Sequence, residues 1–168
     1  ALGTATGDTV FVVELSSYQL SELETSPHIA IVTNLYNDHV DYHGTKEQYW
    51  EAKRNIMRYM SAKDTLIYNP EFDVIKNWLT ESPCQTIAIA STDDIDISKS
   101  RLLGSHNKQN ALMARAAAVA LGIDSTACQK ALDNFEPLPH RLQNVATKNR
   151  ITYIDDAIGS NPEATIAG

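Results

Sequence analysis

The sequence of 168 residues is poor in cysteine and in long apolar runs, and each scarcity excludes a class of protein. Its two cysteines, Cys84 and Cys128, are too few for a disulfide framework or a four-cysteine zinc site. No apolar run reaches the roughly 18 residues of a membrane-spanning helix, and no basic-then-apolar signal segment opens the chain. We therefore expect a protein of a reducing, cytoplasmic compartment, without membrane insertion.

Positive charge is also scarce. The chain has 14 Lys and Arg against 21 Asp and Glu, a net charge of −7, and its longest basic run is Lys53-Arg54. Because binding to a nucleic-acid backbone needs a basic face, no nucleic-acid partner is expected. Anionic ligands would be held by helix ends, metal ions or single basic residues. The 43% hydrophobic and 21% charged side chains are typical of a globular domain, which at this length buries a core without disulfides.

Segments typical of strands and helices alternate along the chain. Residues 9–15 form a β-branched apolar run, which predicts a strand buried on both faces. Further strands are expected at 29–33, 65–68 and 86–90, and helices at 45–60, 71–79, 107–121 and 125–135. After the break at 137–139, two strands are expected at 142–146 and 151–154 around a polar turn. This alternation predicts an α/β fold with a mainly parallel sheet flanked by helices and ligands beyond the carboxyl ends of its strands.

Two polar groups follow the first two predicted strands. Glu14 ends the first strand, where a carboxylate is costly unless it is paired or bound to a cation. The alternative interpretation is a solvent-facing Glu14, with Ser16 or Ser17 capping the next helix. His39 lies among aspartates just after the second strand, and imidazole with oxygen ligands is a plausible metal environment. A surface histidine beside a helix cap is the alternative.

Two predicted helices carry further candidates. Lys53 lies on the inner register of its helix with Tyr49 and Ile56. A solvated lysine is the usual case, whereas a lysine in a metal site must lose its charge, which its readily lowered pKa permits. Asn107 and Asn110 share one face at the start of another helix, where asparagine is usually a cap. Carboxamides at this position could also contact a purine edge or a ribose.

Six strings combine these residues in a fixed order: ELSSYQL (14–20), NDHVDYHG (37–44), AK (52–53), GSHNKQNA (104–111), LPHR (138–141) and DDAIGSNPEAT (155–165). Together they resemble the Mur ligases of peptidoglycan synthesis, over the whole chain. The first string is most similar to that of the members that add D-glutamate to UDP-N-acetylmuramoyl-L-alanine. The implied reaction uses ATP and Mg²⁺ and passes through an acyl phosphate. Another Mur ligase, a folylpolyglutamate-type ligase and a catalytically silent nucleotide-binding module are the alternatives.

The resemblance implies a role for each matching residue. It makes Glu14, His39 and Lys53 magnesium ligands, with Lys53 carried as a carbamate, and His39 and Lys53 the catalytic residues. The implied nucleotide contacts are Asn107, Asn110, Arg141 and Asp156, and the implied substrate contacts are Ser16, Gln19 and Ser160. Residues 1–136 would then be a central ATP-binding domain, and residues 137–168 a hinge with the first strands of a Rossmann-like C-terminal domain.

The chain departs from the family pattern at several places. The family's Gly-x-x-Gly-Lys-Thr phosphate loop is missing from the 168 residues. Tyr42 stands where an arginine is common, and Ala157 and Gly159 replace the usual Ser and Ala. We therefore expect a piece of a longer enzyme, truncated at both ends and lacking the N-terminal phosphate-loop portion, that folds but is inactive alone.

Overall fold

The computed structural model describes residues 2–36, 40–90, 92–159 and 166. A parallel sheet is formed by β1 (Ile29–Val32), β2 (Thr65–Tyr68) and β3 (Gln85–Ala88), in that order. Leu66 of β2 pairs with Ala30 on one side and Thr86 on the other. Parallel neighbours require a crossover between them, and helices supply it here. The predicted parallel α/β fold is confirmed, and these strands lie within one or two residues of their predicted ranges.

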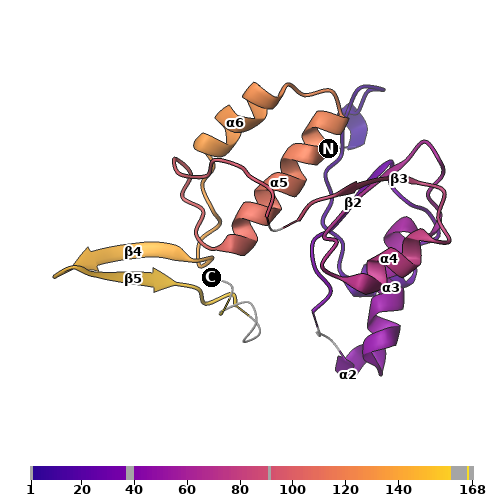
Figure 1. The fold of residues 1–168 in the computed structure, drawn as a ribbon, viewed down its shortest axis with the longest axis horizontal. Helices are drawn as coiled ribbons and strands as arrows, with labels where there is room; N and C mark the ends of the chain where they lie inside the picture. The colour runs from indigo at the N-terminus through magenta and orange to yellow at the C-terminus, as the bar shows by residue number, and fades with distance from the viewer. Residues whose placement is uncertain (1, 37–39, 91, 160–165, 167–168) are drawn as a thin grey trace.

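One short helix precedes β1, and the others lie between the strands of the parallel sheet or after β3 (Figure 1). They are α1 (Ser17–Ser21), α2 (Val40–His43), α3 (Lys46–Arg58), α4 (Asp73–Leu79), α5 (Ser105–Ala120) and α6 (Ser125–Asp133), and a 3-10 turn lies at Leu2–Thr4. Thr45 caps α3, because its hydroxyl accepts a hydrogen bond from the Gln48 amide at 3.1 Å. In the part of the chain that the structure describes, no helix is both long and apolar enough to cross a membrane.

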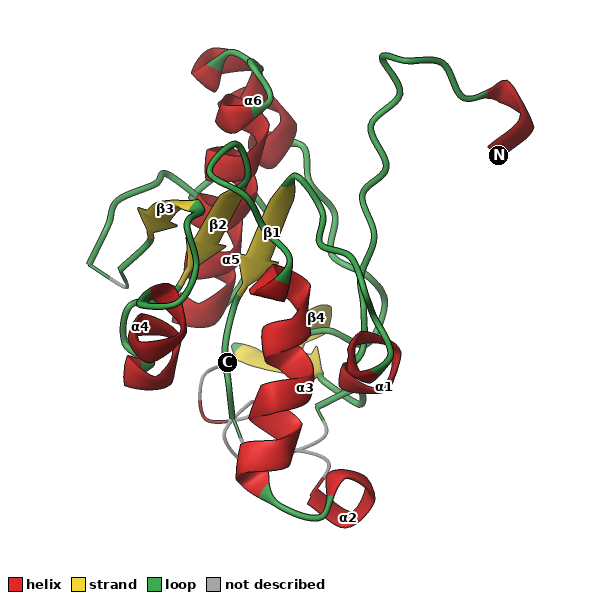
Figure 2. Ribbon diagram, turned by 90° about the vertical axis from the view of Figure 1, so that its right-hand side faces the viewer, coloured by secondary structure: helices red, strands yellow, loops and turns green. Residues whose placement is uncertain are grey.

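The core consists of two apolar layers, one on each face of the sheet. On one face, side chains of β1 and β2 pack with α3 and α4; the buried members include Ala30, Val32, Leu66, Met57, Ile75 and Trp78. On the other face, Ile67 packs with α5 through Leu112 and Met113. Leu66 and Ile67 are adjacent and both are 0% exposed. Because successive strand residues point to opposite faces, they belong to opposite layers. Figure 2 shows the resulting order of layers, with α5 behind the strands and α3 in front.

Residues 9–15 differ from the prediction. They have no regular secondary structure and pair with no strand within the described residues, and Val12 is 94% exposed. A β-branched apolar run indicates a segment that fits a sheet, but a strand forms only when a neighbour with a free edge accepts its hydrogen bonds. The apolar pattern was therefore insufficient to establish this strand.

The amino ends of β1 and β2 are joined by an ion pair. His28 directly precedes β1 and Asp64 directly precedes β2, and the His28 Nδ1 lies 3.0 Å from the Asp64 Oδ1. The Ser61 amide and hydroxyl also donate to Asp64, at 2.7 and 2.8 Å. The hydrogen bond with His28 and those from Ser61 lower the pKa of Asp64 from 3.8 to about 2.

We predict that Asp64→Asn reduces the acid sensitivity of the fold. Because the folded pKa lies below the unfolded one, the stabilisation is complete above 3.8 and is lost as the pH falls towards about 2. Urea unfolding across that window should show a smaller loss of stability in Asp64→Asn than in the wild type. Glu24→Gln, at an exposed position, is the control and should follow the wild type. An equal loss in Asp64→Asn and wild type would contradict the assignment.

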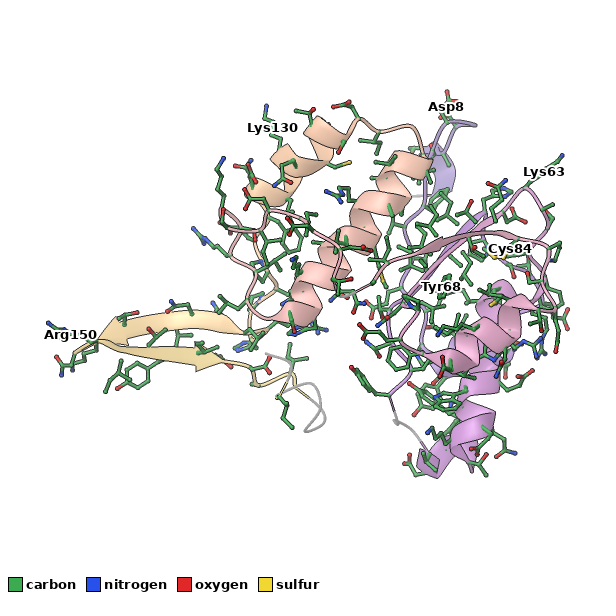
Figure 3. All side chains as sticks on the ribbon, viewed as in Figure 1. Asp8, Lys63, Tyr68, Cys84, Lys130 and Arg150 are labelled. Carbon is green, nitrogen blue, oxygen red and sulfur yellow. The ribbon has the colours of Figure 1, made fainter. Side chains whose placement is uncertain are left out.

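The last two strands form a separate antiparallel hairpin. It consists of β4 (Gln143–Lys148) and β5 (Ile151–Asp155), as the sequence predicts, and Figure 3 shows Arg150 at its tip. The connecting residues Asn149 and Arg150 have φ values of 52° and 65°. Positive φ at both positions is the geometry of a type I′ turn, in which Asn-Gly is the preferred pair. Arg150 therefore adopts a conformation that favours glycine.

Arg150→Gly should stabilise this hairpin. A side chain in the left-handed region costs roughly 1 kcal/mol, which glycine avoids. Amide hydrogen exchange in β4 and β5 should slow by about fivefold. Lys148→Gly, within β4 itself, is the matched control and should speed exchange, because glycine weakens a strand. Faster exchange in Arg150→Gly would show that the turn does not carry this strain.

Candidate functional site

Two helices contribute polar residues at the carboxyl edge of the sheet. The Trp50 indole on α3 donates to the carbonyl of Leu35, which follows β1, at 3.1 Å. The Gln109 amide on α5 donates to the carbonyl of Ile89, directly after β3, at 3.3 Å. These bonds hold the first half of α3 and the start of α5 at the edge where α/β sheets bind ligands.

Glu14 lies just before α1, and α1 packs against α3. The Asn55 side chain on α3 donates to the carbonyls of Leu20 and Ser21 at 2.8 and 3.3 Å, so α1 is fixed against α3, as Figure 2 shows. Glu14 lies two residues before Ser16, the cap of α1, and is exposed. Its carboxylate forms no hydrogen bond or ion pair with any residue that the structure describes, so it is available to a cation.

Ser16 and Gln19 form a capping box at the start of α1. The Gln19 amide donates to the Ser16 hydroxyl at 3.3 Å, and the Ser16 amide donates to the Gln19 Oε1 at 2.9 Å. Two otherwise unpaired amides at the helix start are thereby satisfied. The alternative interpretation of Ser16 as a cap is confirmed. Among the described residues, the side-chain NH2 group of Gln19 keeps no partner and remains free for a ligand.

Lys53 lies half-buried on α3, and its Nζ stands 5.2 Å from the centre of the Tyr49 ring. His39 and Ser160 lie outside the described residues. Mg²⁺ prefers oxygen ligands, which Glu14 supplies. A lysine ammonium has no lone pair and repels the metal, so Lys53 fits the site only as a carbamate, whose oxygens resemble a carboxylate. The described residues contain no cluster of three or more His, Cys, Asp or Glu side chains that could hold a metal by themselves.

An aromatic cluster borders this region, and sequence reasoning assigned it no role. The rings of Tyr18 and Tyr42 lie 4.4 Å apart in an edge-to-face arrangement, and His43 lies 4.9 Å from Tyr42 and 5.5 Å from Tyr49. The His43 Nε2 is hydrogen-bonded to the Ser17 hydroxyl at 3.0 Å. The signal in the sequence was the excess of rings at 18, 42, 43 and 49, within or beside the matching strings.

The two candidate asparagines lie at the start of α5. Asn107 donates from its amide nitrogen to the carbonyl of Leu103 at 2.7 Å, which ties the first turn of the helix to the preceding loop. Asn110, one turn further on, is exposed. Lys108, between them, pairs with Asp94 at 3.1 Å, and this contact lowers the pKa of Asp94. In the described part of the chain, the side-chain oxygen of Asn107 and the side-chain amide of Asn110 form no hydrogen bond, so both are open to a ligand.

Asp156, just after β5, is hydrogen-bonded to the backbone next to Arg141. The Leu142 amide donates to the Asp156 carboxylate at 3.2 Å, so Asp156 lies beside the backbone that carries Arg141. His140 pairs with Asp155 at 2.7 Å, and the pKa of Asp155 is lowered by that bond and by the Ala157 amide. Among the described residues, no hydrogen bond or ion pair joins Arg141 or Asp156 to the asparagines of α5. The structure thus brings the four proposed nucleotide residues together in two pairs.

A parallel sheet covered by helices on both faces, with polar side chains gathered at its carboxyl edge, defines an α/β domain of the ligand-binding type. Residues 2–98 match the family described as Mur ligase middle domain. The chain belongs to the Mur ligase family, as the resemblance of its strings predicts.

Named relatives are similar over nearly the whole chain. A UDP-N-acetylmuramoylalanine--D-glutamate ligase of Streptococcus thermophilus is 34% identical over 96% of this chain, and one of Enterococcus hirae is 32% identical over the same share. The chain spans about 40% of the length of these curated relatives. MurF from Acinetobacter baumannii superposes with a TM-score of 0.72 at 22% identity, covering 90% of this chain and 38% of that one, which supports the shared fold.

Proposed function

We propose that this chain is part of an ATP-dependent ligase that joins D-glutamate to UDP-N-acetylmuramoyl-L-alanine. The observation that carries the proposal is the similarity over 96% of the chain to ligases named for that reaction. The discriminating string, residues 14–20, forms the cap and body of α1, and α1 packs against the helix that carries Lys53. The residues assigned to substrate and metal therefore come from elements in contact.

The proposed reaction has two steps. An oxygen of the substrate's alanyl carboxylate attacks the γ-phosphorus of ATP, the bond to the bridging oxygen breaks, and ADP leaves with that electron pair. The amine of D-glutamate then attacks the carbonyl carbon of the acyl phosphate, inorganic phosphate leaves, and the amine loses a proton. An amide bond is formed at the expense of one phosphoanhydride bond.

Glu14, His39 and Lys53 are the proposed residues that hold the magnesium ion. Bound Mg²⁺ would neutralise the phosphate oxygens and orient the in-line transfer. Lys53 contributes after its amine combines with carbon dioxide and releases a proton, which converts a cation into an anionic oxygen ligand. Without that change, an ammonium about 4 Å from a divalent ion would be repelled by several kcal/mol even at an effective dielectric constant near 20.

The remaining polar residues are assigned by the same resemblance. Asn107 and Asn110 would contact the adenine side of the nucleotide, Arg141 its phosphates and Asp156 its ribose. Ser16 and Gln19 would contact the muramoyl substrate, with the free Gln19 amide as the available donor. Ser160 would lie near the incoming D-glutamate. Residues 137–168, including the hairpin of β4 and β5, would belong to the hinge and the start of the C-terminal domain.

The choice of amino acid tests the function. The full-length protein that contains this chain, supplied with ATP, Mg²⁺ and UDP-N-acetylmuramoyl-L-alanine, should release phosphate with D-glutamate and not with L-lysine or meso-diaminopimelate. Mass spectrometry of the product should give the D-glutamyl adduct. Preference for another amine, or for a folate substrate, would place the protein elsewhere among these ligases. No phosphate release with any of them would favour a silent nucleotide-binding module.

Lys53→Ala in the same protein should lower turnover by about two orders of magnitude or more, because a metal ligand is lost. The matched control is Lys46→Ala on the same helix, since Lys46 also lies over an aromatic ring, at 4.1 Å from the Trp50 centre. The control should retain turnover within about twofold. Carbon-13 NMR with labelled bicarbonate should show a carbamate signal that Lys53→Ala lacks. Normal turnover in Lys53→Ala would remove Lys53 from the site.

A further inference from the structure

The side chain of His43 in α2 contacts both α1, which follows Glu14, and α3, which carries Lys53. His43 ends α2, and its Nε2 is hydrogen-bonded to the hydroxyl of Ser17, the first residue of α1. On its other side the ring lies against Tyr49 of α3, with the centroids 5.5 Å apart. Ser17 is only 3% exposed, so its hydroxyl depends on this partner rather than on water.

Both partners of His43, Ser17 and Tyr49, lie close in the sequence to proposed metal ligands. Ser17 lies three residues after Glu14, and Tyr49 lies one helical turn before Lys53, whose Nζ is 5.2 Å from its ring. The bond between Ser17 and His43 therefore fixes the chain that follows Glu14, while the ring contact fixes the turn of α3 below Lys53. At the far end of α1, Asn55 supplies the second attachment.

We propose that His43 is a positioning residue, whose hydrogen bond to Ser17 and ring contact with Tyr49 hold Glu14 in register with Lys53. The part of this proposal that concerns metal binding rests on the proposed function. His43 itself touches neither substrate nor metal. A metal site requires its ligands within a few tenths of an ångström, so a loosened α1 weakens the site without unfolding the domain.

Tyr42, one of the departures from the family pattern, also contacts the ring of His43. It stands where an arginine is common, and it packs edge-to-face on Tyr18 while contacting the His43 ring. Tyr42 and Tyr18 are 63% and 37% exposed, so they cover the histidine from the solvent side. In this chain an aromatic contact between α1 and α2 takes the place of a charged side chain.

Three variants of the full-length protein separate the parts of the proposal. His43→Phe keeps a ring but loses the hydrogen bond, and Ser17→Ala removes the same bond from the other partner with little change in volume. His43→Gln keeps a side-chain amide that can form a hydrogen bond near the Nε2 position and serves as the conservative replacement. His28→Ala is the matched control, because it removes a histidine with a 3.0 Å partner at the opposite edge of the sheet.

The first measurement is amide hydrogen exchange of residues 16–21, compared with Asp73–Leu79 of α4 in the same sample. In His43→Phe and in Ser17→Ala, exchange in α1 should become about five- to tenfold faster, while α4 is unchanged. The double variant should resemble either single one, since both remove one bond. Unchanged exchange in α1 would overturn the proposal at its structural step.

The second measurement is binding of Mn²⁺, a paramagnetic probe for the magnesium site, followed by electron paramagnetic resonance. His43→Phe should bind Mn²⁺ about five- to tenfold more weakly, His43→Gln should return within about twofold of the wild type, and His28→Ala should match it. Faster exchange with normal Mn²⁺ affinity would overturn the positioning role and leave His43 a fold contact. A wild-type protein that exchanges as expected but binds no Mn²⁺ would instead reject the proposed metal site.

Discussion

The structure depends on the burial of β2 on both of its faces. Leu66 and Ile67 are adjacent in the chain and wholly buried, one under α3 and α4 and the other under α5. Because side chains alternate along a strand, this single element holds two helical layers together. The paired strands β1 and β3 share its direction, so their carboxyl ends meet at one edge. Trp50 and Gln109 bind α3 and α5 to backbone groups at that edge, and α1 is bound to α3, so the candidate residues of these helices depend on the sheet for their position.

Specific hydrogen bonds then fix the positions of α1, α3 and α5, which packing of the core alone does not fully determine. Trp50 and Gln109 fasten α3 and α5 to the carbonyls that follow β1 and β3, and Asn55 fastens α1 to α3. These are bonds from side chains to backbone groups, which are strongly directional and lose most of their value when misaligned. The apolar layers therefore determine which elements pack together. The polar contacts fix the relative positions of the segments that carry Glu14, Lys53 and Asn107.

Much of the fold and part of the site could be predicted from residue patterns. The three paired strands, α3 to α6 and the hairpin lie where the residue patterns predict them. Ser16 caps α1, which was one of the two interpretations of this segment. Residues 9–15 fit the pattern of a strand but pair with no strand among the described residues, because β-propensity does not supply a neighbouring edge. The bond between His43 and Ser17 was missed, since 26 residues separate the partners and no local pattern links them.

The sequence by itself determined the α/β class, the family and the identity of the candidate residues, because alternating periodicity and ordered strings are properties of the chain alone. Only the tertiary structure decided which candidates adjoin one another. It placed α1 against α3 and set Asp156 beside the backbone next to Arg141, and among the described residues no hydrogen bond or ion pair links that pair to Asn107. The physical reason is that proximity between distant segments follows from how two faces of one strand are covered, and that packing is not encoded in any local run of residues.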